Sequence, residues 1–238
     1  MEIFAHRGSS GTHPENTLAA FQEAARLPIS GVELDVHLTK DGEIVVIHDE
    51  RIDRTSTGSG LVKEMTLEQL KSYDYGSWFS DAFKGERIPT LEEVFQVFDN
   101  TNHRINIEIK SDVYAYEGLE EKVIALIEQY GFEKRVILSS FNHEAIRKVK
   151  QLAPTLPTAA LFMEALVEPI AYMERVPTDG LHLYRPAAHH PFVKEVLAQG
   201  MPVRVFTVNK QKDVEKMQEI GVHAIFTDYP EKALSYLK

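Results

Sequence analysis

The sequence predicts an α/β protein and, within that class, a closed (β/α)8 barrel, the TIM-barrel fold. Strand-like and helix-like stretches alternate along the whole chain, which is typical of a parallel sheet whose strands are connected by helices. There are eight such units in 238 residues, close to the usual barrel length of about 250 residues. The glycine fingerprint GxGxxG is absent after the first strand, which disfavours the alternative, an open doubly wound sheet.

Each unit is a short apolar strand-like run followed by a helix-like stretch. The expected strands cover residues 2–6, 31–37, 104–110, 135–140, 158–162, 180–184, 202–208 and 224–228. The expected helices cover residues 15–27, 90–98, 119–130, 143–152, 164–173, 189–199, 211–220 and 230–237. We expect these units to form a single domain over residues 1–238.

Residues 49–89 interrupt the alternation inside the second unit. They contain the loop sequence RTSTGSG and then TLEQL, which predicts a short helix with a capping box from Thr66 to Gln69. The aromatic stretch YDYGSWFSDAF follows, and we expect the single tryptophan of the chain, Trp78, to pack among its aromatic neighbours. We interpret residues 49–89 as a small insertion that covers part of the barrel mouth.

Composition narrows the possible functions. Hydrophobic residues make up 43% and charged residues 26% of the chain, as in an ordinary soluble globular protein. The chain has no cysteine, which excludes disulfides, thiolate zinc sites and cysteine nucleophiles. The net charge of −10 argues against nucleic-acid binding, because phosphate backbones are held by clustered Lys and Arg. No apolar run reaches about 18 residues and no secretory signal is visible, so we expect a cytoplasmic protein without a membrane anchor.

Carboxylates occupy alternate positions of the second strand. In GVELDVH, Val32, Leu34 and Val36 share one face, while Glu33 and Asp35 share the other. A barrel strand turns one face to the helices and the other to the lumen. We therefore expect both carboxylates inside, near the end where barrel enzymes carry out their chemistry. The next run, EIVVIHDE, is almost continuously apolar at its start, which predicts burial on both faces.

Two further strands end in ionisable residues. The isoleucines of RINIEIK are expected on the outer face, which leaves Asn106, Glu108 and Lys110 inside. His6 ends the first strand, and the loop that follows begins with Arg7. Ionisable side chains therefore meet at one end of the predicted barrel.

The carboxylates also have purely structural interpretations. Glu33 and Asp35 could form the solvated face of an edge strand, and Glu108 and Lys110 could form a structural ion pair. Glu15 could close a capping box with Thr12 at the start of the first helix.

The histidines have structural interpretations as well. His6 could be a core histidine, and His48 could simply follow a strand into a turn. We interpret His182, His189 and His190 as polar residues of the lumen and loops without a catalytic role. Their joint placement with the carboxylates at strand ends favours a functional role for His6 and His48.

Seven ordered blocks of the sequence resemble the glycerophosphodiester phosphodiesterase family. The blocks are AHRG (5–8), PENT (14–17), VELDVHLTKDG (32–42), VVIHD (45–49), NIEIK (106–110), FTVN (206–209) and TDYP (227–230). The resemblance covers nearly the whole chain. It implies a (β/α)8 barrel that cleaves glycerophosphodiesters, as small-molecule substrates, to sn-glycerol 3-phosphate and an alcohol.

The resemblance also implies a metal site and an acid/base pair. A divalent cation, Ca²⁺ or Mg²⁺, would be bound by Glu33, Asp35 and Glu108. The histidines of the AHRG and VVIHD blocks, His6 and His48, would transfer protons.

Four more residues match substrate-binding positions of the family. Arg7 and Lys110 match its phosphate contacts, and Glu15 matches a supporting carboxylate. Phe206 stands where the family commonly has tryptophan, and it keeps an apolar surface but lacks the indole N–H.

These residue types suit cleavage of a phosphodiester. Three carboxylates favour a hard cation that prefers oxygen, and such a cation neutralises phosphate charge. Imidazoles, with an unperturbed pKa of about 6.5, can act as base on the entering oxygen and acid on the leaving one. No Ser, Cys or Thr stands in a recognisable nucleophile motif. The attacking oxygen therefore comes from water or from the substrate. We expect a neighbouring hydroxyl of the substrate to attack, because it is held beside phosphorus, and this gives a cyclic phosphodiester that water then opens.

Two other functions stay open at this point. One is a lysophospholipase D or sphingomyelinase D activity, disfavoured because those enzymes are typically secreted and disulfide-bonded. The other is a non-catalytic sensor of polyol phosphates, which should have lost His6, His48 or a metal carboxylate. The sequence also leaves open the preferred alcohol, the choice between Ca²⁺ and Mg²⁺, and the oligomeric state.

Overall fold

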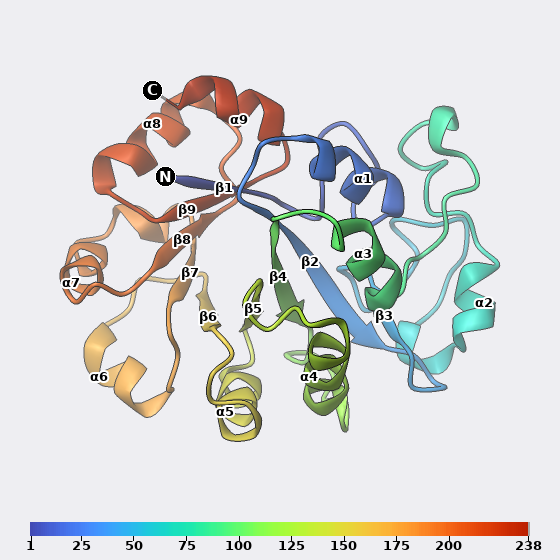
Figure 1. Cartoon of the computed structure of the whole chain (residues 1–238), viewed down its shortest axis with the longest axis horizontal. Coiled ribbons are helices and arrows are strands. Elements are labelled where there is room, and N and C mark those ends of the chain that lie inside the picture. The colour runs from blue at the N-terminus through green and yellow to red at the C-terminus, as the bar shows by residue number, and fades with distance from the viewer. Residues whose placement is uncertain (238) are drawn as a thin grey trace.

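A closed barrel of eight parallel strands forms the centre of the computed structural model, which describes residues 1–237 (Figure 1). The barrel strands are β1 (Glu2–Ala5), β2 (Gly31–Leu38), β4 (Arg104–Ile109), β5 (Val136–Ser140), β6 (Thr158–Phe162), β7 (Leu181–Tyr184), β8 (Val203–Phe206) and β9 (Ala224–Thr227). They are hydrogen-bonded in the order β1-β9-β8-β7-β6-β5-β4-β2, and pairing of β1 with β2 closes the ring. The predicted barrel is confirmed.

Helices surround the barrel and connect its strands (Figure 1). They are α1 (Leu18–Arg26), α3 (Leu91–Phe98), α4 (Leu119–Tyr130), α5 (His143–Leu152), α6 (Pro169–Arg175), α7 (Phe192–Ala198), α8 (Gln211–Ile220) and α9 (Pro230–Tyr236). Outward side chains of the strands pack against them: Val32, Leu34 and Val36 share one buried core with Phe95 of α3. The predicted alternation of outward and inward residues on β2 is confirmed. Within residues 1–237, every helix is too short or too polar to cross a membrane.

The first helix begins later than the sequence pattern predicts. It starts at Leu18, with Thr17 as the N-cap whose side chain accepts a hydrogen bond from the Ala20 N–H. Asn16 has a φ of 55°, in the left-handed region, which a continuous helix from residue 15 would not allow. Residues 14–17 therefore form a turn at the barrel mouth.

Strand β3 (Ile44–Val46) lies outside the ring and runs antiparallel to β2. Ile44 and Val46 join the main core, while Val45 joins a second apolar cluster, so the predicted burial on both faces is confirmed. Because β3 returns along β2, the N–H of Ile47 donates to the backbone oxygen of Asp35 at 3.0 Å. This pairing brings the next residue, His48, to the pocket that Glu33 also lines.

Residues 49–89 lie beyond α1 and α3 in Figure 1 and share a small core with residues 45 and 47, in and just after β3. The core side chains are Val45, Ile47, Ile52, Val62, Leu70, Tyr75 and Ile88. Helix α2 (Leu67–Lys71) begins with the predicted capping box between Thr66 and Gln69. Trp78 packs edge-on against Phe79 at 5.7 Å, yet 40% of its surface stays exposed. Apolar contacts thus hold the segment together and against β3.

Candidate active site

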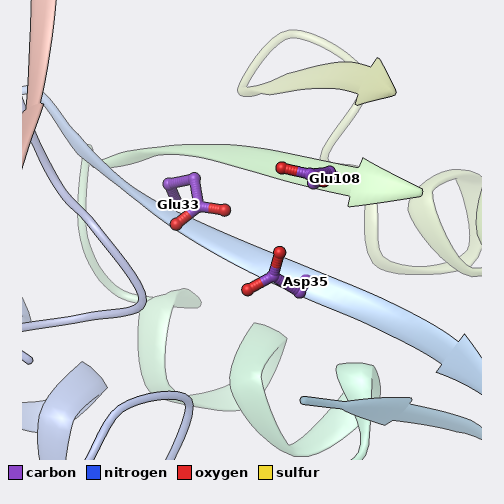
Figure 2. A group of neighbouring side chains, drawn as sticks. All are labelled: Glu33, Asp35 and Glu108. Carbon is purple, nitrogen blue, oxygen red and sulfur yellow. The ribbon is translucent and has the colours of Figure 1, made fainter. Parts of the chain in front are cut away.

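Three carboxylates meet inside the C-terminal end of the barrel (Figure 2). Glu33 and Asp35 come from β2, and Glu108 comes from β4, where it is the register partner of Asp35. All three are buried, and one oxygen from each lies within 4.8 Å of the others. An edge strand with a solvated face is therefore wrong for Glu33 and Asp35, because closure of the ring removes the edge.

The carboxylates strongly affect one another's charge. Burial raises the pKa of Glu33 well above its usual value, and the charges of Asp35 and Glu108 act in the same direction. Burial and Asp35 also raise the pKa of Glu108. Burial opposes ionisation of Asp35, but the charges of His48 and Arg7 outweigh it and lower the pKa of this carboxyl. Three crowded oxygen donors fit a hard divalent cation, which would relieve their repulsion.

Arg7 contacts two members of the acidic cluster. Its backbone N–H donates to Glu33 Oε2 at 2.8 Å, and its Nε lies 3.5 Å from Asp35 Oδ2. Arg7 has a φ of 56°, in the left-handed region that a non-glycine residue adopts only where its surroundings require it. The Arg7 side chain is held by the nearby carboxylate of Glu15, whose Oε1 accepts from Nη1 at 2.7 Å.

Lys110 supplies a second buried positive charge. Its Nζ donates to Glu108 Oε1 at 2.9 Å, so the ion pair considered from the sequence is present. Burial lowers the pKa of Lys110, but the charges of Glu108 and Asp35 outweigh burial and raise it above its usual value. Lys110 therefore stays charged at the edge of the cluster.

His6 is held by an aspartate from the far end of the chain. Its Nδ1 lies 2.7 Å from Asp228 Oδ1. Asp228 in turn accepts from Asn209 Nδ2 at 2.6 Å and from Ser10 Oγ at 3.2 Å. Burial opposes ionisation of Asp228, but these hydrogen bonds, that of His6 first, lower the pKa of its carboxyl. An ionised Asp228 requires a proton on His6 Nδ1, which leaves Nε2 free for chemistry.

His48 has the same arrangement with the residue that follows it. Its Nδ1 lies 2.6 Å from Asp49 Oδ1, and Arg54 Nε donates to Asp49 Oδ2 at 2.7 Å. The backbone of His48 is held as well, because Nε2 of His37 in β2 lies 3.1 Å from its carbonyl oxygen. Both catalytic candidates therefore have an aspartate on Nδ1.

Glu15 binds two arginines and takes no part in a capping box with Thr12, so that structural interpretation is wrong. Its carboxylate accepts from Arg7 and from both terminal nitrogens of Arg54. Thr12 Oγ1 instead donates to the backbone oxygen of Ser9, because α1 begins further along the chain. Burial opposes ionisation of Glu15, but hydrogen bonds from Arg54 and the charge of Arg7 lower the pKa of its carboxyl.

A pocket at the barrel mouth joins these groups to an apolar wall. The charged side is lined by His6, Arg7, Glu33, His48 and Glu108, and the apolar side by Phe141, Leu161, Phe206 and Phe226. Phe206 ends β8, and its ring centroid lies 6.0 Å from that of Phe141 and 6.1 Å from that of Tyr184. His182 lies at the buried side of this pocket, while His189 and His190 are exposed.

Several polar residues of the site have no role in the sequence analysis. They are Asn16, whose Nδ2 donates to Asp35 at 2.9 Å, together with Asp49, Arg54, Asn209 and Asp228. Four of them lie in the quoted blocks PENT, VVIHD, FTVN and TDYP. Membership of these blocks was the signal available in the sequence, whereas Arg54 lies in the loop that follows VVIHD.

The chain is similar to known proteins over nearly its whole length. Residues 6–232 match the model of the glycerophosphoryl diester phosphodiesterase family. A glycerophosphodiester phosphodiesterase of Caldanaerobacter subterraneus subsp. tengcongensis is 45% identical over 236 residues, which cover 99% of this chain and 97% of the relative. One from Bacillus altitudinis is 41% identical over 236 residues, covering 98% and 96%.

A solved structure extends the similarity to the fold. An Oleispira antarctica phosphodiesterase in complex with the product sn-glycerol-3-phosphate is similar with a TM-score of 0.89 and 34% identity. The match covers 99% of this chain and 96% of the other. The chain therefore belongs to the glycerophosphoryl diester phosphodiesterase family and is a phosphoric diester hydrolase.

Proposed function

We propose that this chain is a metal-dependent glycerophosphodiester phosphodiesterase that releases sn-glycerol 3-phosphate and an alcohol. One observation carries the proposal: His6 and His48 line the same pocket as the acidic cluster, and each has an aspartate on its Nδ1. Because each aspartate occupies Nδ1, the Nε2 atom of each histidine is free to transfer a proton. The product in the Oleispira relative supports sn-glycerol 3-phosphate as the product here.

Glu33, Asp35 and Glu108 would hold the cation, Ca²⁺ or Mg²⁺, through oxygen atoms alone. When bound, a divalent cation neutralises phosphate charge and lowers the pKa of a hydroxyl beside it. Arg7, which lines the pocket, and Lys110, which pairs with Glu108 beside it, bind phosphate oxygens, since both stay protonated.

Two residues orient the substrate without touching phosphorus. Glu15 holds the Arg7 guanidinium at 2.7 Å and keeps it over the cluster. Phe206 provides an apolar surface for the carbon skeleton of the diester, supported by Phe141 and Tyr184.

The reaction runs in two steps. One histidine accepts the proton of the glycerol hydroxyl next to the phosphoester, and the oxygen of this hydroxyl forms a bond to phosphorus. The other histidine protonates the departing alcohol as its P–O bond breaks, which leaves a cyclic phosphodiester. The roles then reverse, and water opens the ring to sn-glycerol 3-phosphate. Attack from within the substrate gains an effective molarity of about 10⁵ M or more when the hydroxyl is well oriented.

A coupled assay for sn-glycerol 3-phosphate tests this function. Glycerophosphocholine, glycerophosphoethanolamine and glycerophosphoglycerol are offered to protein treated with EDTA, with and without added Mg²⁺ or Ca²⁺. We expect turnover with metal and loss without it, and an H48Q variant should be inactive while H189Q, which changes an exposed histidine, is unaffected. Full activity in EDTA contradicts the metal assignment, and no release from any diester contradicts the function. The cytoplasmic location stays a prediction.

A further inference from the structure

Arg54 connects the part of the site that carries His48 with the part that carries the phosphate-binding residue Arg7. Its Nε and Nη2 donate to the two oxygens of Asp49 at 2.7 and 3.1 Å. Its Nη1 and Nη2 donate to the two oxygens of Glu15 at 2.8 Å each. The guanidinium thus binds one carboxylate along each of two edges, which is the strong bidentate geometry available to arginine.

Each of these carboxylates holds a different residue of the site. Asp49 Oδ1 lies 2.6 Å from His48 Nδ1, and Glu15 Oε1 accepts from Arg7 Nη1 at 2.7 Å. A chain of charged contacts therefore runs from His48 through Arg54 to Arg7. Without the guanidinium, Asp49 and Glu15 would repel each other and turn more freely.

The guanidinium has little capacity left for substrate. An arginine has five N–H donors, and the hydrogen bonds that Arg54 makes within residues 1–237 use four of them. The Arg54 side chain is also 45% exposed, whereas Arg7 is 18% exposed. Arg54 is therefore poorly suited to bind phosphate directly.

The backbone around Arg54 is well anchored. Ile52 is fully buried in the second apolar cluster, and its N–H donates to the Gly60 oxygen at 3.1 Å. Thr55 is buried on the other side of Arg54. The long side chain thus starts from a defined position.

We propose that Arg54 is a positioning residue that orients His48 through Asp49 and Arg7 through Glu15. The segment 49–89 thereby contributes to catalysis without contacting the reacting atoms. The inference rests on the proposed roles of His48 and Arg7.

The first test compares R54Q, R54K and R51Q. We expect R54Q to lower kcat about 10- to 100-fold with a smaller change in KM, because His48 loses its orientation while Arg7 keeps its own contacts to Glu15 and Glu33. R54K should recover part of kcat, since a point charge can satisfy one carboxylate at a time. Arg51 is the matched control, because it pairs with Asp53 at 3.1 Å and has no hydrogen bond to the pocket among the described residues. R51Q should leave kcat unchanged.

A double-mutant comparison separates positioning from a merely structural role. Because Arg54 acts in part through Asp49, the losses of kcat in D49N and R54Q should be less than additive in D49N/R54Q. Additive losses, a wild-type kcat in R54Q, or a rise in KM alone would each overturn the proposal. Thermal unfolding is followed for every variant, and R54K keeps the comparison available if R54Q does not fold.

A measurement without turnover distinguishes this inference from the proposed function. The ¹H–¹⁵N imidazole spectrum should show His48 with its proton on Nδ1 in the wild type and a mixture of tautomers in R54Q. An unchanged His48 spectrum in R54Q contradicts the positioning role. A wild-type protein that cleaves no glycerophosphodiester removes the proposed function instead, whatever this spectrum shows.

Discussion

Asp228 Oδ1 lies 2.7 Å from His6 Nδ1, although the two residues are 222 positions apart in the sequence. Strands β1 and β9 are neighbours in the barrel, and pairing of Ala5 with Thr227 places the next residue of each strand side by side. Asp228 is itself held by Asn209. The orientation of His6 therefore depends on three segments from opposite ends of the chain.

Removing the Asp228 charge should slow turnover. In D228N the amide can donate to the imidazole and favour the wrong tautomer, so we expect kcat to fall about 100-fold or more. Steady-state kinetics with glycerophosphoethanolamine measures the change. D99N is the control, because Asp99 is exposed after α3. Wild-type turnover in D228N would mean that His6 needs no carboxylate partner.

Neutralising Glu33 should separate metal binding from stability. In E33Q the amide oxygen can still accept the Arg7 N–H, while repulsion within the acidic cluster decreases, so the metal-free variant should be at least as stable as the wild type. A cation at 100 times its Kd should stabilise the wild type by about 2.7 kcal/mol, and E33Q should lose most of this gain.

Thermal unfolding with and without Mg²⁺ or Ca²⁺ measures both effects. E133Q provides a control in which an exposed glutamate is neutralised. The metal assignment is contradicted if E33Q keeps the full metal-dependent rise in Tm.

His182 should make the fold sensitive to acid. Burial lowers the pKa of His182 well below its usual value, and the nearby charge of Arg204 acts in the same direction. Below about pH 6.5 the His182 imidazole therefore binds a proton in the unfolded chain but stays neutral in the folded chain. The free energy of unfolding has its full value above that pH, and it falls by up to about 1.4 kcal/mol per pH unit as the pH decreases.

Urea unfolding across this pH range compares wild type with H182Q. The amide oxygen introduced in H182Q can still accept from Arg204, as His182 Nε2 does at 3.3 Å, so the variant should lose less stability in acid. H189Q, at an exposed histidine, should follow the wild-type curve. Parallel curves for wild type and H182Q would show that His182 is not the sensitive group.

The substrate's own hydroxyl should be required for fast cleavage. A diester that lacks the hydroxyl next to the phosphoester should bind but turn over at least about a thousandfold more slowly, roughly 4 kcal/mol of barrier. Phosphorus NMR of the normal reaction should show a transient cyclic phosphodiester. Comparable turnover of the deoxy analogue would instead support direct attack by water.

The barrel and the direction of its side chains are predictable from the sequence alone. The alternation of Val32, Leu34 and Val36 with Glu33 and Asp35 predicts which side of β2 faces the lumen. The capping box at Thr66 is predictable for the same reason, because strand alternation and helix caps are properties of neighbouring residues on a regular backbone.

Which side chains meet depends on the tertiary structure. Asp228 reaches His6 because β1 pairs with β9 in the ring, and Arg54 reaches Glu15 because a loop folds back to the barrel mouth. The antiparallel return of β3, which carries His48 to the carboxylates, also depends on this packing. Such contacts join residues distant in sequence, and their geometry depends on the strand register and on the path of the loops. The spacing of residues along the chain predicts neither of these.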